Sequence, residues 1–467
     1  MTKAFGISIR VAGVEHSKPP AVSLENDDTG GSLCSTPATR FTKLSRRAFT
    51  ALGAGALSAL PAAAAPDKPK AALRGKAQSC ILLWMGGGMC HVDTLDPKTV
   101  GDAKVNKAGS AYSSIPTAIH GARVCEHLYR AASLLDRGVL LRTLTHPLKV
   151  DHADSTGLMK TGRLTSGTVV YPSLGSLITH QRGRRADAIP PYLVMGYPNV
   201  TRGPGFLGGQ YGYLYLTDPE AGPTGLRSPF DVSAGRQKRR TDLLSLLRKS
   251  TAASTDKVTS EYDAAIGEAQ KLMTGAFSRV FNLKAEKATT RERYGGGFGQ
   301  RCLLARRLVE SGARFVEVAY DLNFKNGTGW DTHRHGQAQQ HLLIQDLDQA
   351  LSALVEDLEL RGLLDETLIV LATEFGRPPE FDGKGGRGHQ SAAFSAALFG
   401  GGIRTGQVIG ETDELGRKVV DRPITVPDFH ATILEALGID PATELYDENR
   451  PIPITDHGRA IDDLFSS

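Results

Sequence analysis

The stretch TLIVLATEFGR, residues 367–377, decides the fold class. Its first seven residues are apolar or β-branched without a polar alternation, which is typical of a strand buried on both faces of a parallel sheet. The run ends abruptly at Glu374 and Arg377. Because open α/β sheets carry their chemistry beyond the carboxyl ends of their strands, the stretch predicts a carboxylate and a guanidinium at a functional edge.

Apolar runs of the same kind recur along the chain, at residues 79–85, 138–146, 313–320 and 393–400. Helical periodicity lies between them, at residues 127–137, 301–312, 341–365 and 426–440. Strands that alternate with helices predict an α/β fold, with a mostly parallel sheet and helices on both faces.

Residues 66–467 show no internal repeat and no clear linker, so we expect a single α/β domain. Within it, residues 196–240 are crowded with Gly, Pro and Tyr, which predicts an irregular insertion. Insertions of that length are more often functional than accidental. This insertion is therefore expected to influence the choice of substrate.

The first 65 residues are expected to lie outside that domain. Residues 1–44 are rich in Ser, Thr, Pro and Gly, which is typical of a disordered leader. Arg46 and Arg47 then precede an apolar run, Ala51 to Leu60, and a small-residue cleavage site. This order predicts a twin-arginine signal, and therefore the twin-arginine export machinery as a partner and a periplasmic or otherwise extracytoplasmic location. The alternative is an exposed basic loop before an Ala-rich helix.

Composition argues against several classes of protein. Beyond residue 65, 48 Lys and Arg remain against 46 Asp and Glu, so nothing indicates a nucleic-acid partner. No later segment has the roughly 20 apolar residues that a transmembrane helix needs. The four cysteines beyond the leader have no Cys-x-x-Cys spacing. That argues against a cysteine-held zinc cluster and leaves one or two disulfides open.

Metal-capable or nucleophilic side chains concentrate in four places, each after a predicted strand or at the start of a helix. They are GGGMCHVDTLDPK with His91, Asp93 and Asp96; HPLKVDHADSTGLMKTGR with His146, His152, Asp154, Ser155 and Arg163; GWDTHRHG with Asp331, His333 and His335; and TEFGRPPEFDGKGGRGHQ with Glu374, Arg377 and His389. In a parallel sheet these places lie along one rim. Such ligands suit zinc or another borderline divalent ion, and a serine beside the ion could attack a phosphoryl or sulfuryl centre. Asp93 or Asp154 could instead cap a helix.

Several motifs resemble, in order and wording, the family named domain of unknown function 1501. They are ILLWMGGG…HVDTLDPK, MKTGR, YPSLGS, CLLARRLVESGARFVEV…WDTH, TEFGR, GRGHQ and DFHATILEALGID, which together span nearly the whole chain beyond the leader. Members of that family are exported proteins related to the alkaline phosphatase and sulfatase superfamily. The resemblance implies a phosphatase-like α/β sandwich, and it carries no firmly established activity.

The resemblance also implies roles for individual residues. ADSTGLMKTG is similar to the superfamily's nucleophile motif and nominates Ser155. Asp331 with His335 has the superfamily's metal-ligand spacing, whereas the family's own wording favours Asp331 with His333. Glu374 stands where a strand normally ends in the Asp-His-Gly of the second metal site. His389, which precedes a predicted strand, matches the histidine that closes the first site.

Departures from the superfamily pattern bear on the metal. Gly86–Gly88 replace the metal-holding Asp at the end of the first strand, so Asp93 or Asp96 must reach back as a substitute. The His that normally follows the second-site carboxylate is absent. A single-metal or metal-free site is therefore implied in place of two metals. No Cys-x-Pro-x-Arg sequence exists, which disfavours a formylglycine sulfatase, and His430 is expected to be structural.

Arg377 is expected to bind a substrate oxyanion in bidentate fashion, or to form an ion pair with Glu374 that closes a turn. The sequence thus favours an exported metal-dependent hydrolase of small anionic phosphate or sulfate esters. One alternative is a non-catalytic extracytoplasmic binding or assembly protein on a phosphatase-like fold. A second is a serine hydrolase that uses Ser155, because ADSTG approximates Gly-x-Ser-x-Gly with Ala153 in the first Gly position.

Overall fold

The computed structural model describes residues 73–148, 151–196, 202–216, 222, 232–251, 267, 272, 275–320, 329–333, 336–383 and 385–465. All of them belong to the unit Leu73–Ser467. The predicted leader 1–65 and His335 lie outside the described residues, as does part of the insertion at 196–240. Among the described helices, none combines the length and the apolar character that crossing a membrane requires.

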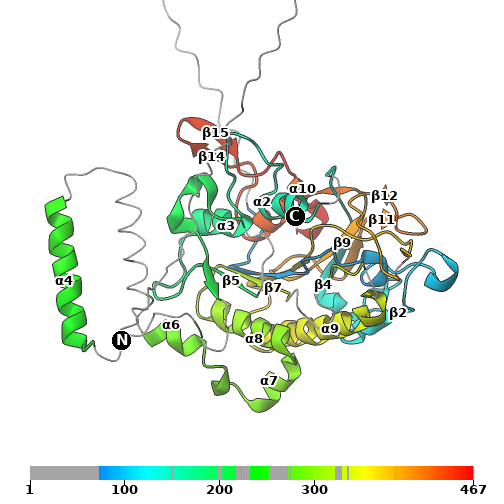
Figure 1. The fold of residues 1–467 in the computed structure, drawn as a ribbon, viewed down its shortest axis with the longest axis horizontal. Helices are drawn as coiled ribbons and strands as arrows, with labels where there is room; N and C mark the ends of the chain where they lie inside the picture. Colours follow the sequence, from blue (N-terminus) through cyan, green and yellow to red (C-terminus); the bar gives the residue numbers. More distant parts are fainter. Residues whose placement is uncertain are drawn as a thin grey trace, which may run out of the picture. The chain divides into compact units, whose positions relative to one another are not determined.

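The described residues form a nine-stranded sheet, with neighbours in the order β10-β4-β9-β8-β1-β7-β5-β6 and with β13 beside β4 (Figure 1). The strands from β8 to β6 pair in parallel, β10 and β13 run parallel to β4, and β9 is antiparallel to β4 and β8. The predicted α/β fold with a mostly parallel sheet is confirmed. The strands are β1 Ser79–Trp84, β4 Gly138–Thr145, β5 Tyr192–Met195, β6 Leu214–Leu216, β7 Phe315–Ala319, β8 Thr367–Ala372, β9 Phe394–Gly400, β10 Gln407–Ile409 and β13 Ile424–Thr425.

Short antiparallel pairs and helices complete the described part. The pairs are β2 Ser114–Pro116 with β3 Arg123–Cys125, β11 Glu411–Thr412 with β12 Val419–Asp421, and β14 Glu444–Asp447 with β15 Arg450–Pro453. The α-helices are α1 Tyr129–Ala132, α2 His152–Thr161, α3 Leu174–Arg182, α4 Ala234–Thr251, α6 Gly275–Val280, α7 Ala288–Tyr294, α8 Gly297–Glu310, α9 Gly336–Leu360 and α10 Val426–Ala436.

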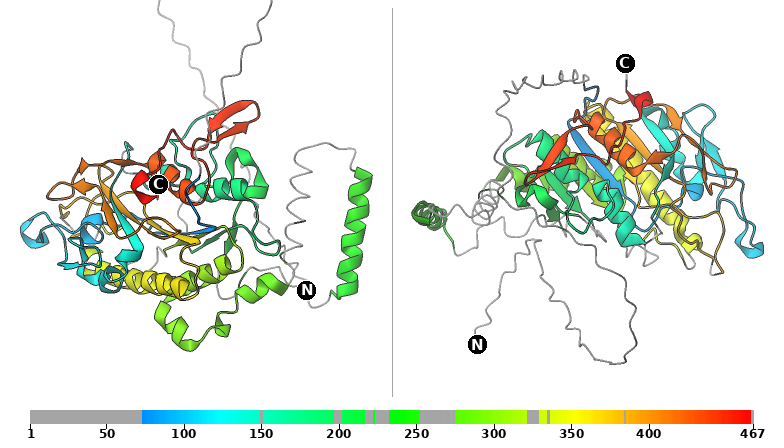
Figure 2. Two further views of the ribbon diagram at one scale, coloured as in Figure 1. Left: turned by 180° about the vertical axis from the view of Figure 1, so that it is seen from behind. Right: turned by 90° about the horizontal axis from the view of Figure 1, so that it is seen from above.

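Helices cover both faces of the sheet, and the alternation of side chains along β1 shows why. Ile81 and Leu83 pack in one apolar cluster with residues of α8 and α9. Cys80, Leu82 and Trp84 pack in the other with residues of α2, α3 and α10. Because successive side chains of a strand point to opposite faces, a strand covered on both sides must be apolar throughout. Figures 1 and 2 show the two helical layers.

Some predicted helices differ in length from the observed ones. The pattern at 127–137 yields only the single turn α1, between the 3-10 turns Glu126–Leu128 and Leu135–Arg137. The carboxylate of Asp348 explains where α1 begins, because it accepts hydrogen bonds from the backbone N–H groups of Arg130 and Ala131. By contrast, α10 has the full set of end signals: a Thr425 cap, a capping box with Asp428, and Gly438 at φ +65° after its end.

Cys80, Cys90, Cys125 and Cys302 are all free and buried, so the described residues contain no disulfide. Burial raises the pKa of each thiol, which keeps them in the unreactive protonated form. In the described part they act as small core residues.

Leu83→Ala should lower the free energy of unfolding by about 2–5 kcal/mol, because it opens a cavity between β1 and the α8–α9 layer. Leu83 is fully buried, whereas Val105 is 71% exposed. Val105→Ala is the matched control and should change stability by about 0.5 kcal/mol or less. Urea unfolding measures both. Equal effects of the two substitutions would contradict the assignment of β1 to the centre of the core.

Candidate metal centre

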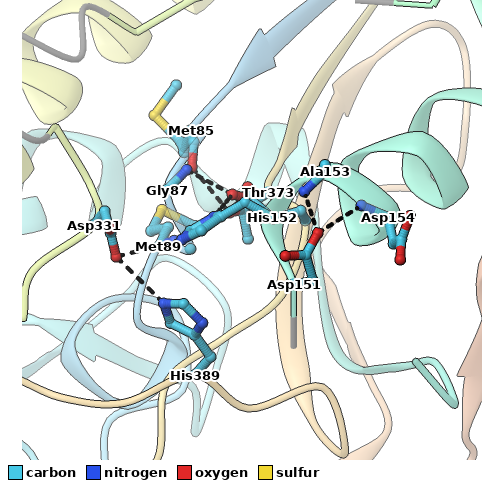
Figure 3. A network of polar contacts seen from close by, with 12 residues as sticks. Met85, Gly87, Met89, Asp151, His152, Ala153, Asp154, Asp331, Thr373 and His389 are labelled. Atoms are coloured by element: carbon cyan, nitrogen blue, oxygen red, sulfur yellow. Dashed lines mark hydrogen bonds and ion pairs between the residues drawn. The ribbon is translucent and has the colours of Figure 1, made fainter. Parts of the chain in front are cut away.

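The carboxyl ends of β1, β7 and β8 lie next to one another, since Trp84 is opposite both Ala319 and Ala372. The segments that follow these strands therefore meet at one rim of the sheet. The first residue of α2, His152, reaches the same rim (Figure 3). Asp151 fixes that helix end, because its side chain accepts hydrogen bonds from the backbone N–H groups of Ala153 and Asp154.

Glu374, the carboxylate at the end of the β8 stretch, lies behind His152. Its Oε1 atom accepts a hydrogen bond from Nδ1 of His152 at 2.8 Å and another from the Gly87 backbone N–H at 2.8 Å. Its Oε2 atom accepts one from the Thr373 hydroxyl at 3.1 Å. The side chain is only 1% exposed. Glu374 is therefore held by three donors and in turn orients the imidazole.

The second ring nitrogen of His152, Nε2, is directed into the rim. It lies 3.5 Å from Oδ1 of Asp331, and it is buried without a hydrogen-bond partner among the described residues. Burial favours the neutral imidazole, but the contacts with Asp331 and Glu374 outweigh it and raise the pKa of His152 to about 9. A proton or a metal ion at Nε2 would satisfy this atom.

Asp331 is the centre of the cluster. Its Oδ1 atom lies 3.3 Å from Nε2 of His389 and 3.0 Å from Nε2 of His333, and those two nitrogens are 2.7 Å apart. Burial disfavours the charged carboxylate, but the close contacts with His152 and His389 and the charge of Arg377 hold the pKa of Asp331 far below its ordinary value. Burial lowers the pKa of His333, which favours the neutral form of this ring.

Arg377 is fully buried and holds the rim together. Its Nε donates to the Gly88 carbonyl, its Nη1 to the carbonyls of Arg387 and Gly388, and its Nη2 to the Gly87 carbonyl and to Asp331. A guanidinium has five N–H donors, and these five acceptors occupy them all. In this arrangement no donor remains for the substrate oxyanion that we expected Arg377 to bind. The guanidinium fixes Asp331 instead.

The residues present fit a divalent metal ion. Ligand atoms of His152, Asp331 and His389 all lie within 4.8 Å of one another. Two ligands about 2.1 Å from a tetrahedral zinc ion are roughly 3.4 Å apart, close to the 3.5 Å and 3.3 Å from Asp331 to the two imidazoles. A carboxylate behind a ligating histidine, as Glu374 is behind His152, is the usual support of such a ligand. The side chain of Asp331 is 30% exposed, so the cluster is open to solvent.

The structure brings together Asp331, His333, Glu374, Arg377 and His389 of the residues singled out from the sequence. From the sequence we expected Glu374 itself to face the metal; in the structure His152 stands in front of it. His152 was among the metal-capable residues but not in the expected ligand set. Its place directly after the helix-capping Asp151 was the available signal.

Two other expected site residues lie elsewhere. Both carboxylate oxygens of Asp93 pair with the buried Arg387, at 2.8 and 2.9 Å, so Asp93 is not part of the cluster. Ser155 lies on α2 one turn beyond His152, fully buried, and its hydroxyl has no hydrogen-bond partner among the described residues. Nε2 of His430 donates a hydrogen bond to the carbonyl oxygen of Met159 on α2, at 2.8 Å. It therefore lies in the core, as expected.

In the presence of a metal chelator, the protein should lose stability as the pH rises from about 6.5 through about 9. Because the folded state raises the pKa of His152 from 6.5 to about 9, the protonated imidazole stabilises the fold fully below the lower value and not above the upper one. After solvent screening the loss should be about 1–3 kcal/mol. Urea unfolding at both ends of this window measures it. His152→Gln should abolish this part of the pH dependence, whereas substitution of the exposed His120 should not; an unchanged profile in His152→Gln would contradict the prediction.

Comparison with known proteins places the chain in a family. No curated protein matches its sequence. Among solved structures it is similar to the PsFucS1 sulfatase from Pseudoalteromonas sp. (TM-score 0.36, 13% identity, 83% of this chain and 71% of that chain). It is also similar to a protein in the alkaline phosphatase superfamily from Vibrio parahaemolyticus (TM-score 0.34, 11% identity, 79% and 68%) and to the phosphonate monoester hydrolase SpPMH from Silicibacter pomeroyi (TM-score 0.37, 12% identity, 82% and 76%). The model of the family described as "Protein of unknown function (DUF1501)" matches residues 77–465, and the chain belongs to that family.

Proposed function

We propose that this protein is a metal-dependent hydrolase of phosphate or sulfate esters with a single metal ion at the rim. The observation that carries the proposal is the buried Nε2 of His152, which makes no hydrogen bond within the described residues and lies 3.5 Å from Oδ1 of Asp331, near His389, while Glu374 holds the other ring nitrogen. The class of ester follows from the resemblance of ADSTGLMKTG, WDTH and TEFGR to motifs of the phosphatase and sulfatase superfamily.

The residues of the site have two roles: some are ligands of the ion, and others orient those ligands. His152, Asp331 and His389 hold it, and His333 is close enough to exchange with His389 or to join it. Glu374 accepts a hydrogen bond from the N–H group at Nδ1 of His152, so the lone pair of Nε2 is available to the ion. When bound, the ion supplies Lewis acidity toward an ester oxygen and lowers the pKa of a water molecule.

Arg377 contributes by orienting Asp331. Its guanidinium neutralises part of the carboxylate charge and directs Oδ1 toward the imidazoles. Arg377 also ties that carboxylate to the turn after β1 through the carbonyls of Gly87 and Gly88. Its role is thus to preorganise a ligand before the ion arrives.

Ser155 has less support as a nucleophile. A catalytic serine is activated by a base within hydrogen-bond distance of its hydroxyl or by a metal ion. The hydroxyl of Ser155 has no hydrogen-bond partner among the described residues, and Ser155 is not part of the ligand cluster. The same geometry offers no support to the serine hydrolase alternative. In the proposed mechanism the attacking group is a water molecule at the open side of the cluster, where His333 is 41% exposed.

Protein purified from a metal-replete host should contain about one divalent metal ion per chain, and it should turn over an aryl phosphate or an aryl sulfate. His152→Ala, Asp331→Ala and His389→Ala should each lose most of the metal and the turnover, because three-ligand sites tolerate few losses. Elemental analysis and a chromogenic assay measure the two quantities. The matched control is His120→Ala, since His120 is exposed.

Metal-free wild-type protein without turnover would contradict the proposed function. Metal without turnover of either ester would instead favour the non-catalytic binding or assembly protein. Turnover that survives complete removal of metal and disappears in Ser155→Ala would favour the serine hydrolase.

We also propose that the protein is exported through the twin-arginine route, on the strength of Arg46 and Arg47 before the apolar run. Replacing both arginines by Lys should leave the full-length chain in the cytoplasm, because that route requires the arginine pair. Cell fractionation with an antibody measures it. The control replaces Arg40, which precedes the signal; export that is unaffected by the Arg46 and Arg47 change would contradict the proposal.

A further inference from the structure

A buried ion pair connects α2 to the centre of the sheet. Nζ of Lys160 lies 2.7 Å from Oε1 of Glu317, and the two side chains are 4% and 1% exposed. Nζ also lies 3.8 Å above the centre of the Trp84 ring. Glu317 is in the middle of β7 and Trp84 ends the neighbouring strand β1. Lys160 thus joins the helix that begins with His152 to the two strands beneath it.

The surroundings of this pair are mostly apolar. Glu317 lies on the same face of β7 as Phe315 and Ala319, the face that packs against α2, α3 and α10. Apart from the contact with each other, Nζ of Lys160 and both oxygens of Glu317 have no hydrogen-bond partner among the described residues. The cavity beside them has a volume of about 10 Å³, which holds one water molecule at most.

A gain in the free energy of folding does not explain why an ion pair occupies this buried position. Removing two charges from water costs several kcal/mol each, and replacing a buried ion pair by well-packed apolar residues is often neutral or stabilising. Burial lowers the pKa of Lys160, and the charges of Glu317 and Glu374 oppose this shift. An ion pair is, however, directional in a way that apolar packing is not. The pair can therefore fix both the rotation of a helix about its axis and its position over the sheet.

We infer that the Lys160–Glu317 pair positions α2 so that the imidazole of His152 faces Asp331 and His389. Apolar contacts of α2 come from Leu158 and Met159, next to Lys160. His152 is eight residues earlier, about 12 Å along the helix axis, so it moves with any tilt or rotation at that anchor. The expected weakening of the metal site rests on the proposed function. The effect of the pair on the position of His152 does not.

The test replaces both charges at once, with Lys160→Met and Glu317→Leu in one chain. The double variant should unfold at a urea concentration close to that of the wild type. It should nevertheless bind Zn²⁺ about 10–100-fold more weakly, as happens when support of a metal ligand is lost. In the presence of a chelator, the ¹³C-labelled histidine signal of His152, assigned with His152→Gln, should move. The matched control is the exposed pair Lys238–Asp242 on α4, replaced by Gln and Asn.

A stable double variant with unchanged Zn²⁺ affinity and an unmoved His152 signal would overturn the inference, because the pair would then serve packing alone. If the wild type binds no Zn²⁺, the proposed function fails, while the His152 signal still decides this inference. If the double variant does not fold, Lys160→Arg takes its place. Its planar, longer head group cannot occupy the same position, so it should shift the His152 signal, and an unmoved signal would overturn the inference.

Discussion

The rim of the sheet depends on one buried guanidinium. The five N–H groups of Arg377 reach the turn after β1, the segment that leads to His389, and the carboxylate of Asp331. These segments are distant in sequence and meet at this side chain and its neighbours. Since a buried donor without an acceptor costs about 1–3 kcal/mol, the five bonds are satisfied together or the arrangement fails as a whole. Lysine, with three donors on one atom, has no equivalent geometry.

Glycines make that convergence feasible. Gly87 adopts φ +112°, and a Cβ atom there would lie 2.5 Å from the backbone nitrogen of Asp331. At Gly88, φ is +86° and a Cβ atom would lie 2.6 Å from the Phe375 ring. These two glycines let the turn after β1 approach the Asp331 segment and the Phe375 ring closely. A side chain at either position would push these segments apart, so the close packing of the rim depends on them.

The sequence predicted the architecture well because buried parallel strands and amphipathic helices leave strong patterns. β1, β7 and β8 were visible as apolar runs, and the polar residues after them were expected at one rim. The arrangement of side chains within the rim could not be predicted from the sequence. A difference of about 3 Å decides whether Glu374 or His152 faces Asp331 and His389. The partner of Asp93 was equally hidden: Arg387 lies almost 300 residues later in a glycine-rich stretch, and spacing carries no information about that contact.

The thiols of the described residues have a consequence for the conditions in which the chain can fold. Cys80, Cys90, Cys125 and Cys302 are packed in the interior with no covalent cross-link between them. Neither an oxidant nor a disulfide isomerase is needed to complete this part of the fold. This part of the chain can therefore fold in a reducing as well as in an oxidising compartment.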